Sequence, residues 1–555
     1  MKAADYIVDE LIRQGVTHAF GVPGGVILSL IRAMEERHSE LTPHLNYHEQ
    51  MAGFAACGYA QAKGNMGVAY ATRGPGIMNM MTCIAEAYQE SLPVLFIASH
   101  ASMDKKFGMR HENNQEMDLV DVLSKFTKYS ARIDLVQDVQ EKVESACMIA
   151  KEGRKGPVFL DIYTKIFDQE IPVKEKKEKE NNEYGDCDDI YNIIEKNIYN
   201  SKRPILLIGD GLRNIEGIHC LEKFQIPIIS SRGAQDLFKT SKFYYGYIGS
   251  HGTRYGNFIL EKSDLIVAIG NRMAFPIESE SYYPMMKRKK IIRIDIDEKE
   301  FLREMPYSLD YHIDARKIIN FLYNKNINLC CKKEWLSVCR NIKNLLENYD
   351  ILEPVDKIID YMKMETESSS YVCDIGNNEF WFARAYEKSD WIKGRVFYSK
   401  NFGCLGAALG RAIGVYYATN ESVTCIIGDQ GFQYNIQELE YIAKWNIPIK
   451  IVLMNNSTSG MIYDHEKKRF GEKIFHVTKE SGYGVPNFKE IVKGYGIHYI
   501  LGGEVKEKNL PRAPYVYEIV YETEKELVPF LPKRRRCQNM EPKLEKSMYD
   551  YLNQM

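Results

Sequence analysis

Short apolar runs alternate with amphipathic stretches over the first 170 residues of the chain. Residues 4–14 place apolar side chains at helical spacing, and residues 94–99 and 157–162 are short apolar runs. Runs of strand length that alternate with helical patterns are typical of βαβ units. The pattern therefore predicts a parallel sheet covered by helices.

The same alternation occurs twice more along the chain. The predicted strands are residues 204–209, 265–270 and 291–297 in the second block, and 371–374, 423–429 and 449–455 in the third. A chain of 555 residues is too long for a single hydrophobic core. We therefore predict an α/β protein with three doubly wound parallel-sheet domains. The expected parts are a domain over 1–173, a charged linker over 174–189, a central domain over 190–330, a third domain over 331–525, and a basic, irregular tail over 526–555.

Composition and charge argue against several classes of partner. The formal net charge is −2, which gives no reason to expect nucleic acid or an anionic membrane. No apolar run reaches the roughly 18–20 residues that span a bilayer, and the amino-terminal stretch does not resemble a signal peptide. The twelve cysteines are scattered and form no C-x-x-C pair. We expect reduced thiols in the protein core and a cytoplasmic location.

The third block brings two polar side chains to one edge of its sheet. The strand at 423–429 ends at Gly428 and Asp429, a helical stretch follows over 436–445, and the strand at 449–455 ends before Asn456. Parallel strands joined in this way end at the same edge, where open α/β sheets bind ligands. A carboxylate and an amide oxygen suit Mg²⁺, which in turn suits a diphosphate. An ordinary βαβ unit with an aspartate turn is the alternative.

The first block carries a carboxylate in an unusual setting. A strand with Tyr47 and His48 is expected to run into Glu49, and the helix that follows is almost uncharged. A buried carboxylate is costly without a partner, so Glu49 indicates a function. The alternative is an acid that complements the helix dipole. Small residues at 52, 53, 55, 56, 58 and 60 allow close helix packing, which we expect at a subunit interface.

These segments resemble thiamine-diphosphate enzymes, in particular the catalytic subunit of acetolactate synthase. The Gly-Asp start, with Asn456 placed 27 residues after Asp429, is similar to the family's metal and diphosphate motif. The resemblance implies that thiamine diphosphate and Mg²⁺ are cofactors. It also implies that Asp429, the Asn456 side chain and the Thr458 main-chain carbonyl bind the metal. Glu49 is the implied catalytic residue, because in the family this glutamate hydrogen-bonds the aminopyrimidine ring and activates the cofactor.

The resemblance assigns the surrounding loops as well. The first domain is expected to bind the aminopyrimidine ring, and the third the diphosphate. Leu405 has the position of an apolar wedge under the thiazolium ring, and the Gly403 carbonyl is expected to accept a hydrogen bond from the cofactor. Gln430, itself an expected cofactor contact, stands where the family has a small residue, so Gly431 is expected to approach the phosphate. The other expected contacts are Pro23, Gly24, Gly74, Gly376, Asn377, Asn378, Cys404 and Gly428 for the cofactor, and Gly25, Gln115 and His465 for the substrate.

Simpler readings exist for two of these segments. Residues 374–378 also fit a plain Asn-rich turn, and Leu405 also fits a core leucine. In the family, the two domains of one site usually come from different subunits. The resemblance therefore implies a homodimer or homotetramer with active sites between subunits. It implies small-molecule substrates, with no nucleic acid or membrane partner.

Three positions depart from acetolactate synthases. Pro276 aligns with an arginine on the substrate side of the site, His465 with a tryptophan that sets preference for the second 2-keto acid, and Asn114 with a phenylalanine. Proline cannot replace an arginine that binds a carboxylate at two points. The changes indicate a larger, more polar acceptor pocket, which suits a keto or aldehyde sugar. Residues 481–486 resemble relatives in bacterial surface-polysaccharide pathways, which is analogy alone.

The resemblance leaves FAD open as a further cofactor. Residues 249–252 resemble a flavin-contacting loop of acetolactate synthase. The family's acidic pair near position 276 is missing, which argues against a full flavin site.

The sequence favours a carboligase, a transferase or lyase that decarboxylates a 2-keto acid such as pyruvate and joins the remaining acyl unit to a carbonyl acceptor. Simple decarboxylation with release of an aldehyde is the second hypothesis. A catalytically silent cofactor-binding protein is the third, and the retention of Glu49, Asp429 and Asn456 argues against it. His111 and His465 are candidate proton donors, and an ordinary surface or core histidine is the alternative for each.

Overall fold

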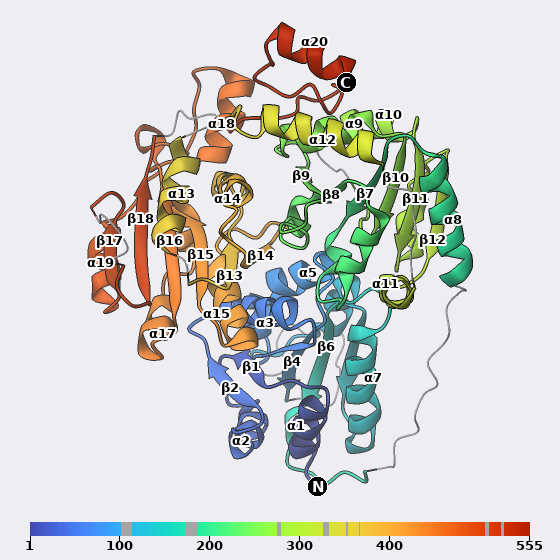
Figure 1. Cartoon of the computed structure of the whole chain (residues 1–555). Coiled ribbons are helices and arrows are strands. Elements are labelled where there is room, and N and C mark those ends of the chain that lie inside the picture. The colour runs from blue at the N-terminus through green and yellow to red at the C-terminus, as the bar shows by residue number, and fades with distance from the viewer. Residues whose placement is uncertain are drawn as a thin grey trace. The chain divides into compact units, whose positions relative to one another are not determined.

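The structure is a computed structural model of the whole chain. It describes residues 1–101, 114–173, 187–274, 279–325, 332–350, 353–365, 367–504, 510–522 and 527–555. These residues form three six-stranded parallel sheets with helices between the strands (Figure 1). The predicted α/β class with three parallel-sheet domains is confirmed. Except for the strand expected to carry Tyr47 and His48, the predicted strands, and the helices predicted at 4–14 and 436–445, agree with observed elements to within two residues at each end.

The first sheet has the strand order β2-β1-β3-β4-β6-β5. Alternate residues of its strands face opposite sides: Leu95 and Ile97 pack with α1, α2 and α7, whereas Val94 and Phe96 pack with α3 and α5. The strands are β1 (His18–Gly21), β2 (Thr42–Leu45), β3 (Gly67–Tyr70), β4 (Val94–His100), β5 (Tyr129–Ile133) and β6 (Val158–Tyr163). The helices are α1 (Ala3–Arg13), α2 (Leu28–Glu36), α3 (Glu49–Lys63), α4 (Pro75–Asn79), α5 (Met81–Gln89), α6 (Val120–Leu123) and α7 (Val139–Lys151).

The third sheet repeats the strand order of the first, as β14-β13-β15-β16-β18-β17. Its strands are β13 (Ser370–Cys373), β14 (Arg395–Tyr398), β15 (Val423–Gly428), β16 (Ile449–Asn455), β17 (His498–Leu501) and β18 (Tyr515–Val520). Its helices are α14 (Asn377–Lys388), α15 (Ala408–Thr419), α16 (Asp429–Tyr434), α17 (Glu438–Lys444), α18 (Gly460–Phe470) and α19 (Phe488–Gly494).

The central sheet has the order β12-β11-β10-β7-β8-β9. Numbered from its own first strand, this is the 3-2-1-4-5-6 order of dinucleotide-binding folds. The strands are β7 (Pro204–Ile208), β8 (Ile228–Ser231), β9 (Tyr244–Ile248), β10 (Leu265–Ile269), β11 (Lys290–Asp295) and β12 (Ser308–His312). The helices here and in the connecting and terminal segments are α8 (Cys187–Asn200), α9 (Arg254–Lys262), α10 (Ser279–Met286), α11 (Ala315–Asn324), α12 (Lys333–Leu346), α13 (Glu353–Met364) and α20 (Lys546–Gln554).

The chain divides into two compact units. One comprises Met1–Lys179, Glu367–Glu379 and Phe397–Thr523, and the other comprises Glu180–Thr366, Phe380–Val396 and Glu524–Met555. The tail therefore belongs to the unit that holds the central sheet. The expectation of an irregular tail was wrong for its last part, because α20 is a helix whose Leu552 is buried. The side chain of Arg254 also donates hydrogen bonds to the main-chain carbonyls of Met540 and Pro542.

Helices α3 and α15 pack at very short range within the first unit (Figure 1). A Cβ on Gly58 would lie 2.2 Å from the main-chain oxygen of Arg411, and one on Gly414 would lie 1.9 Å from that of Ala55. The small residues of α3 therefore allow close packing, as predicted. Their partner, however, is α15 of the same chain, so the expectation of a subunit interface on this face was wrong.

We expect Gly414→Ala to lower the free energy of unfolding by about 1–3 kcal/mol, the usual range for overpacking a core. The added Cβ would meet the backbone of α3, which cannot move aside as a flexible side chain can. Gly494→Ala is the control, because a Cβ there meets nothing within 4 Å. Denaturant unfolding compares the two variants, and equal stability would contradict the packing described here.

None of the described helices is long and apolar enough to cross a membrane. The ten cysteines in the described ranges are free thiols, and nine of them are buried. This agrees with the prediction of reduced thiols in the protein core.

Candidate active site

The strands deliver the predicted site residues to two points where the strand order reverses. In the third sheet, residues 374–378 follow β13, and Asp429 follows the neighbouring strand β15. In the first sheet, Pro23 and Gly24 follow β1, and Gly74 follows the neighbouring strand β3. Ligands of open α/β sheets bind outside the carboxyl ends of strands at such reversals.

Asp429 is buried at the end of β15 and has one unsatisfied oxygen. Its Oδ1 accepts a hydrogen bond of 3.0 Å from the Tyr483 hydroxyl. Its Oδ2 is buried and lacks a hydrogen-bond partner among the described residues. Burial raises the pKa of this carboxyl to about 6, while the Tyr483 hydroxyl and the nearby main-chain N–H groups of Gln430, Ser457 and Asn456 lower it. A buried carboxylate oxygen without a partner is unfavourable, and a bound cation would offset that cost.

Asn456 reaches the same edge of the sheet, because β16 pairs in parallel with β15. The preceding residue, Asn455, is held by Glu518, to which its amide donates a hydrogen bond of 2.5 Å. Asn456 lies beside Gly460, where a Cβ would be 2.8 Å from Asn456 Nδ2 and 3.5 Å from Asn377 Nδ2. The ends of β13 and β16 therefore meet at these two asparagines. Thr458, the third predicted ligand, is buried two residues further along.

Asn378 joins the ends of β13 and β15. Its Nδ2 donates a hydrogen bond of 2.9 Å to the main-chain oxygen of Asp374. A Cβ on Gly376 would lie 2.9 Å from Asn378 Oδ1, and one on Gly428 would lie 3.2 Å from it. Gly376 also has a φ of 122°, which side chains rarely adopt. The backbone at the ends of β13 and β15 therefore packs closely around the buried side-chain amide of Asn378.

The position of the Asp374 side chain accounts for the glycine at position 431. Its buried carboxyl accepts hydrogen bonds from the main-chain N–H groups of Gly406 and Ala408, at 2.9 and 3.2 Å. Burial raises its pKa to about 7, and these two bonds lower it. A Cβ on Gly431 would lie 2.1 Å from Asp374 Oδ2, so a side chain does not fit there. Gln430 instead accepts a hydrogen bond of 2.8 Å from the Ser459 hydroxyl.

Leu405, the predicted wedge under the thiazolium ring, lies in a loop whose backbone is hydrogen-bonded to Asp374 at Gly406 and Ala408. Gly403 and Gly406 have φ angles of 72° and 81°. Cys404 is buried between them, whereas Leu405 is only half-buried. A core leucine would be fully enclosed. A half-buried leucine on a fixed loop instead favours contact with a ligand.

Glu49 begins α3, but its surroundings differ from the expected ones. Strand β2 ends at Leu45, so Tyr47 and His48 lie in a connection and not in a strand. Glu49 is half-buried rather than buried. It also has a partner, because its Oε2 accepts a hydrogen bond of 2.9 Å from Asn79 Nδ2. Among the described residues, we find no hydrogen bond between Glu49 and the third domain.

The other first-domain loops pack on one another. A Cβ on Gly24 would lie 2.5 Å from Thr72 Cβ, and one on Gly74 would lie 2.1 Å from the main-chain oxygen of Gln115. Pro23, Gly25 and Gln115 are exposed. The turn after β3 is therefore covered by the backbone of Gln115, whose side chain faces solvent in the single chain.

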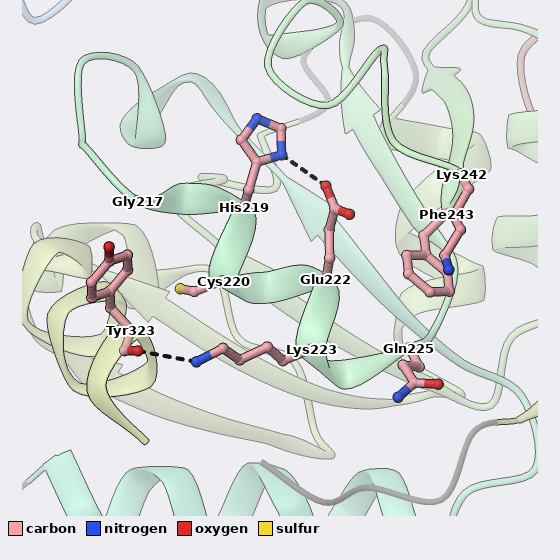
Figure 2. Close-up of a pocket in the computed structure, with 9 residues that line it drawn as sticks. All are labelled: Gly217, His219, Cys220, Glu222, Lys223, Gln225, Lys242, Phe243 and Tyr323. Carbon is pink, nitrogen blue, oxygen red and sulfur yellow. Dashed lines mark hydrogen bonds and ion pairs between the residues drawn. The ribbon is translucent and has the colours of Figure 1, made fainter. Parts of the chain in front are cut away.

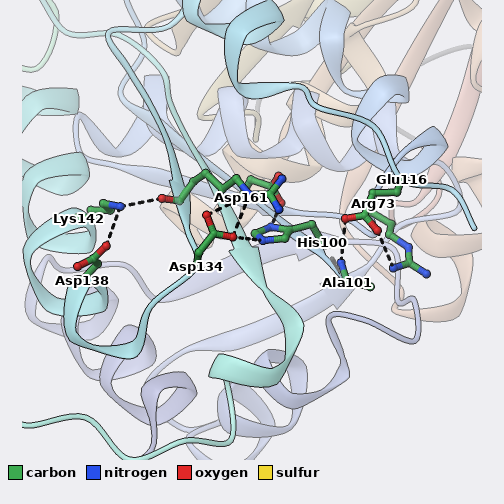
Figure 3. A network of polar contacts seen from close by, with 9 residues as sticks. Arg73, His100, Ala101, Glu116, Asp134, Asp138, Lys142 and Asp161 are labelled. Carbon is green, nitrogen blue, oxygen red and sulfur yellow. Dashed lines mark hydrogen bonds and ion pairs between the residues drawn. The ribbon is translucent and has the colours of Figure 1, made fainter. Parts of the chain in front are cut away.

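A polar network anchors this region (Figure 3). Arg73 lies 3.7 Å from Glu116, which also accepts a hydrogen bond of 3.3 Å from the Ala101 N–H. The neighbouring His100 is buried, with Nδ1 at 3.0 Å from Asp161 and Nε2 at 2.9 Å from Asp134. We did not predict this network, because its members come from distant parts of the sequence.

The residues expected at the acceptor end are only partly described. His465 is exposed on α18, beside Asp464, whose carboxylate accepts a hydrogen bond of 3.0 Å from Asn377. Asn114 is also exposed. Pro276 and His111 lie outside the described residues. The acceptor pocket therefore stays a prediction.

The loop expected to contact a flavin packs against the tail within the second unit. The main-chain N–H of Leu531 donates a hydrogen bond of 2.7 Å to the Ser250 carbonyl, and the side chains of Ser250 and His251 are hydrogen-bonded at 3.0 Å. A cavity of about 640 Å³ lies elsewhere in this unit (Figure 2). Its described lining contains no predicted site residue: Gly217, His219, Cys220, Glu222, Lys223, Gln225, Lys242, Phe243 and Tyr323.

Sequence reasoning missed three residues that contact the site or its supports. Tyr483 lies in residues 481–486, whose resemblance to relatives did not indicate a contact with Asp429. Glu438 lies near the start of the predicted 436–445 helix, and an acid beside buried apolar residues was the available signal. Asn79 carried no such signal, since its contact with Glu49 depends on how α3 and α4 fold together.

Comparison with known proteins agrees with this geometry. Residues 1–122, 193–322 and 374–513 match the N-terminal TPP binding domain, the central domain and the C-terminal TPP binding domain of thiamine pyrophosphate enzymes. The fold and the site therefore define a thiamine-diphosphate-dependent enzyme.

Relatives narrow this class further. The "probable acetolactate synthase large subunit" of Methanococcus aeolicus is 30% identical over 90% of this chain and 87% of its own length. That of Methanocaldococcus jannaschii is 29% identical over 100% of this chain and 98% of its own length. The acetolactate synthase large subunit of Porphyra purpurea is 29% identical over 88% and 86%. The chain belongs to the acetolactate synthase large-subunit-like family of thiamine-diphosphate enzymes.

Proposed function

We propose that this enzyme decarboxylates a 2-keto acid, such as pyruvate, and joins the remaining acyl unit to a carbonyl acceptor. The observation that carries the proposal is the buried, unpaired Oδ2 of Asp429 beside Asn456 at the strand reversal of the third sheet. A neutral structural turn would not leave a buried acid half-satisfied. A site for Mg²⁺ and a diphosphate accounts for it.

The residues present fit thiamine diphosphate and Mg²⁺. Asp429 and the side chain of Asn456, with the Thr458 carbonyl, supply the oxygen ligands that Mg²⁺ prefers. Residues 376–378 and 428–431 lie at the ends of adjacent strands and would hold the diphosphate. Leu405 offers a half-buried apolar surface for the cofactor's rings. When bound there, thiamine diphosphate would supply a carbon nucleophile for the keto group and an electron sink for the decarboxylation.

Glu49 has the catalytic role in this proposal. A carboxylate at the start of α3 can hold a proton at the aminopyrimidine ring, and Asn79 fixes its orientation through the 2.9 Å hydrogen bond. Since Glu49 is half-buried and makes no hydrogen bond to the described residues of the third domain, we infer that it completes a site on a second copy of the chain. The proposal therefore includes a homodimer or homotetramer in the cytoplasm, and the relatives' designation as large subunits leaves room for a regulatory partner.

The acceptor is inferred from three positions that depart from acetolactate synthases. His465 and Asn114 replace large apolar residues, and Pro276 replaces an arginine. We infer a bulky polar acceptor, such as a keto or aldehyde sugar of surface-polysaccharide synthesis. FAD is not included, because the acidic pair of its expected site is missing and the loop at 249–252 is occupied by tail contacts.

The product formed from pyruvate tests the proposal. The purified enzyme with thiamine diphosphate and Mg²⁺ is incubated with pyruvate alone, and then with a panel of keto and aldehyde sugars. Formation of a ligated product is the expected result. Acetaldehyde as the only product would indicate a simple decarboxylase, and no consumption of pyruvate or other 2-keto acids would indicate a silent cofactor-binding protein.

We expect the enzyme to be a poor acetolactate synthase. Loss of a buried two-point contact to the acceptor carboxylate costs about 2–5 kcal/mol, or roughly 30- to 5000-fold in rate. Steady-state acetolactate formation measures this against an acetolactate synthase large subunit assayed in parallel. Equal rates would contradict the proposed acceptor but would not bear on the assignment of the cofactor site.

A further inference from the structure

Glu438 is a fully buried carboxylate at the start of α17, in the third domain. Its Oε1 accepts a hydrogen bond of 2.9 Å from the main-chain N–H of Tyr47, and its Oε2 accepts one of 3.2 Å from Asn46 Nδ2. Both donors belong to the first domain. Burial raises the pKa of Glu438 to about 7, and the bonds from Asn46 and Tyr47 lower it. Burying a carboxylate is energetically costly, and both oxygens of this one bind the same short segment, which indicates a specific role.

The segment that Glu438 holds leads directly into Glu49. The main-chain N–H of Asn46 donates a hydrogen bond of 3.0 Å to the Gly21 carbonyl at the end of β1. His48 caps α3 by accepting a hydrogen bond of 3.1 Å from the Gln50 N–H. The side chains of Asn435 and Gln50 are hydrogen-bonded at 3.4 Å. The connection between β2 and α3 is thus hydrogen-bonded at its start and at its end, and Glu438 binds the residues between.

We propose that Glu438 is a positioning residue for Glu49: it fixes Asn46 and Tyr47, just before the N-cap His48 of helix α3, and so sets the position of the Glu49 carboxylate. This role rests on the function proposed above for Glu49. Glu438 itself touches neither substrate nor cofactor. A shift of about 1 Å in a catalytic group can cost about 100-fold in rate. A carboxylate that accepts two N–H bonds therefore controls the rate through the geometry of its neighbour.

The first test needs no cofactor. Hydrogen exchange followed by mass spectrometry on the apoprotein reports the amides of the peptide that contains Tyr47. Glu438→Ala removes both acceptors, so we expect the Tyr47 amide to exchange at least about tenfold faster. Glu438→Gln keeps one acceptor and should give a smaller change. Glu440→Gln, which removes an exposed acid from the same helix, is the control and should leave exchange unchanged. Unchanged exchange in Glu438→Ala overturns the proposal.

The second test uses the holoenzyme and separates positioning from stability. The C2 proton of bound thiamine diphosphate is exchanged with deuterated water and followed by NMR, a step that depends on Glu49. We expect Glu438→Ala to slow this exchange and kcat about 10- to 100-fold. Cofactor Kd and KM should stay within about twofold, because Glu438 is not among the residues expected to bind cofactor or substrate.

The outcomes distinguish this role from the proposed function itself. Faster amide exchange with a normal C2 exchange rate would leave Glu438 as a plain link between domains and overturn the positioning role alone. If the wild-type protein does not accelerate C2 exchange over free cofactor, the proposed function fails, and the role of Glu438 fails with it. Slower C2 exchange in Glu438→Ala, an intermediate value in Glu438→Gln and a normal value in Glu440→Gln support the proposal.

Discussion

Replacing Asp429 with alanine is expected to abolish retention of thiamine diphosphate at micromolar Mg²⁺. Asp429 contributes the one carboxylate of the expected ligand set, and its Oδ2 lacks a partner among the described residues. Without that charge, an amide and a carbonyl oxygen alone would hold Mg²⁺, which binds its protein ligands chiefly through carboxylates. The diphosphate then loses the cation that neutralises it. Isothermal titration of the apoprotein with thiamine diphosphate, at several Mg²⁺ concentrations, measures the effect.

Two variants make this result specific. Glu472→Ala removes an exposed acid from the same domain and should bind cofactor like the wild type. Asp429→Asn keeps the size and the hydrogen bond from Tyr483, so it should bind weakly, with binding recovered only at millimolar Mg²⁺. The assignment of Asp429 as a metal ligand is wrong if Asp429→Ala retains the cofactor as tightly as the wild type does.

The sequence predicted the strands and the helix that form the third domain's half of the site, because their signals are local. The strand at 449–455 is a β-branched, apolar run bounded by Pro448 and Asn456, and the structure places β16 at these residues. The adjacency of Asp429 and Asn456 then follows from the parallel pairing of β15 and β16. Local pattern and sheet geometry together sufficed for this half of the site.

Long-range contacts were beyond the reach of the pattern. The small residues on α3 indicated a close partner, but nothing in them identified α15, which begins at Ala408, far from the end of α3 at Lys63. The direction of Asp374 depends in the same way on where Gly406 and Ala408 lie in space. The partner of Glu49 was missed for a different reason, since Asn79 is a common surface residue at the end of a short helix. Single residues of this kind acquire a role only through packing.

Glu49→Gln is expected to lower kcat by about 10²–10⁴-fold, the usual effect of removing a positioned acid–base group. Glutamine keeps the size of the side chain, and its oxygen can still accept the hydrogen bond from Asn79. It cannot take up and return a proton at the cofactor ring. The loss should therefore appear in kcat more than in KM. Deuterium exchange at C2 of the bound cofactor, followed by NMR, reports the affected step directly.

A structural role for Glu49 makes a different prediction. An acid that only complements the helix dipole contributes about 0.3–1 kcal/mol of stability and nothing to turnover. Glu141→Gln provides the comparison, because Glu141 is an exposed acid in the first turn of α7, in the same domain. If Glu49 is catalytic, both variants should lose similar small amounts of stability, but only Glu49→Gln should also lose exchange of the cofactor's C2 proton. Wild-type exchange in Glu49→Gln would remove this residue from the mechanism and, with it, most of the case for catalysis.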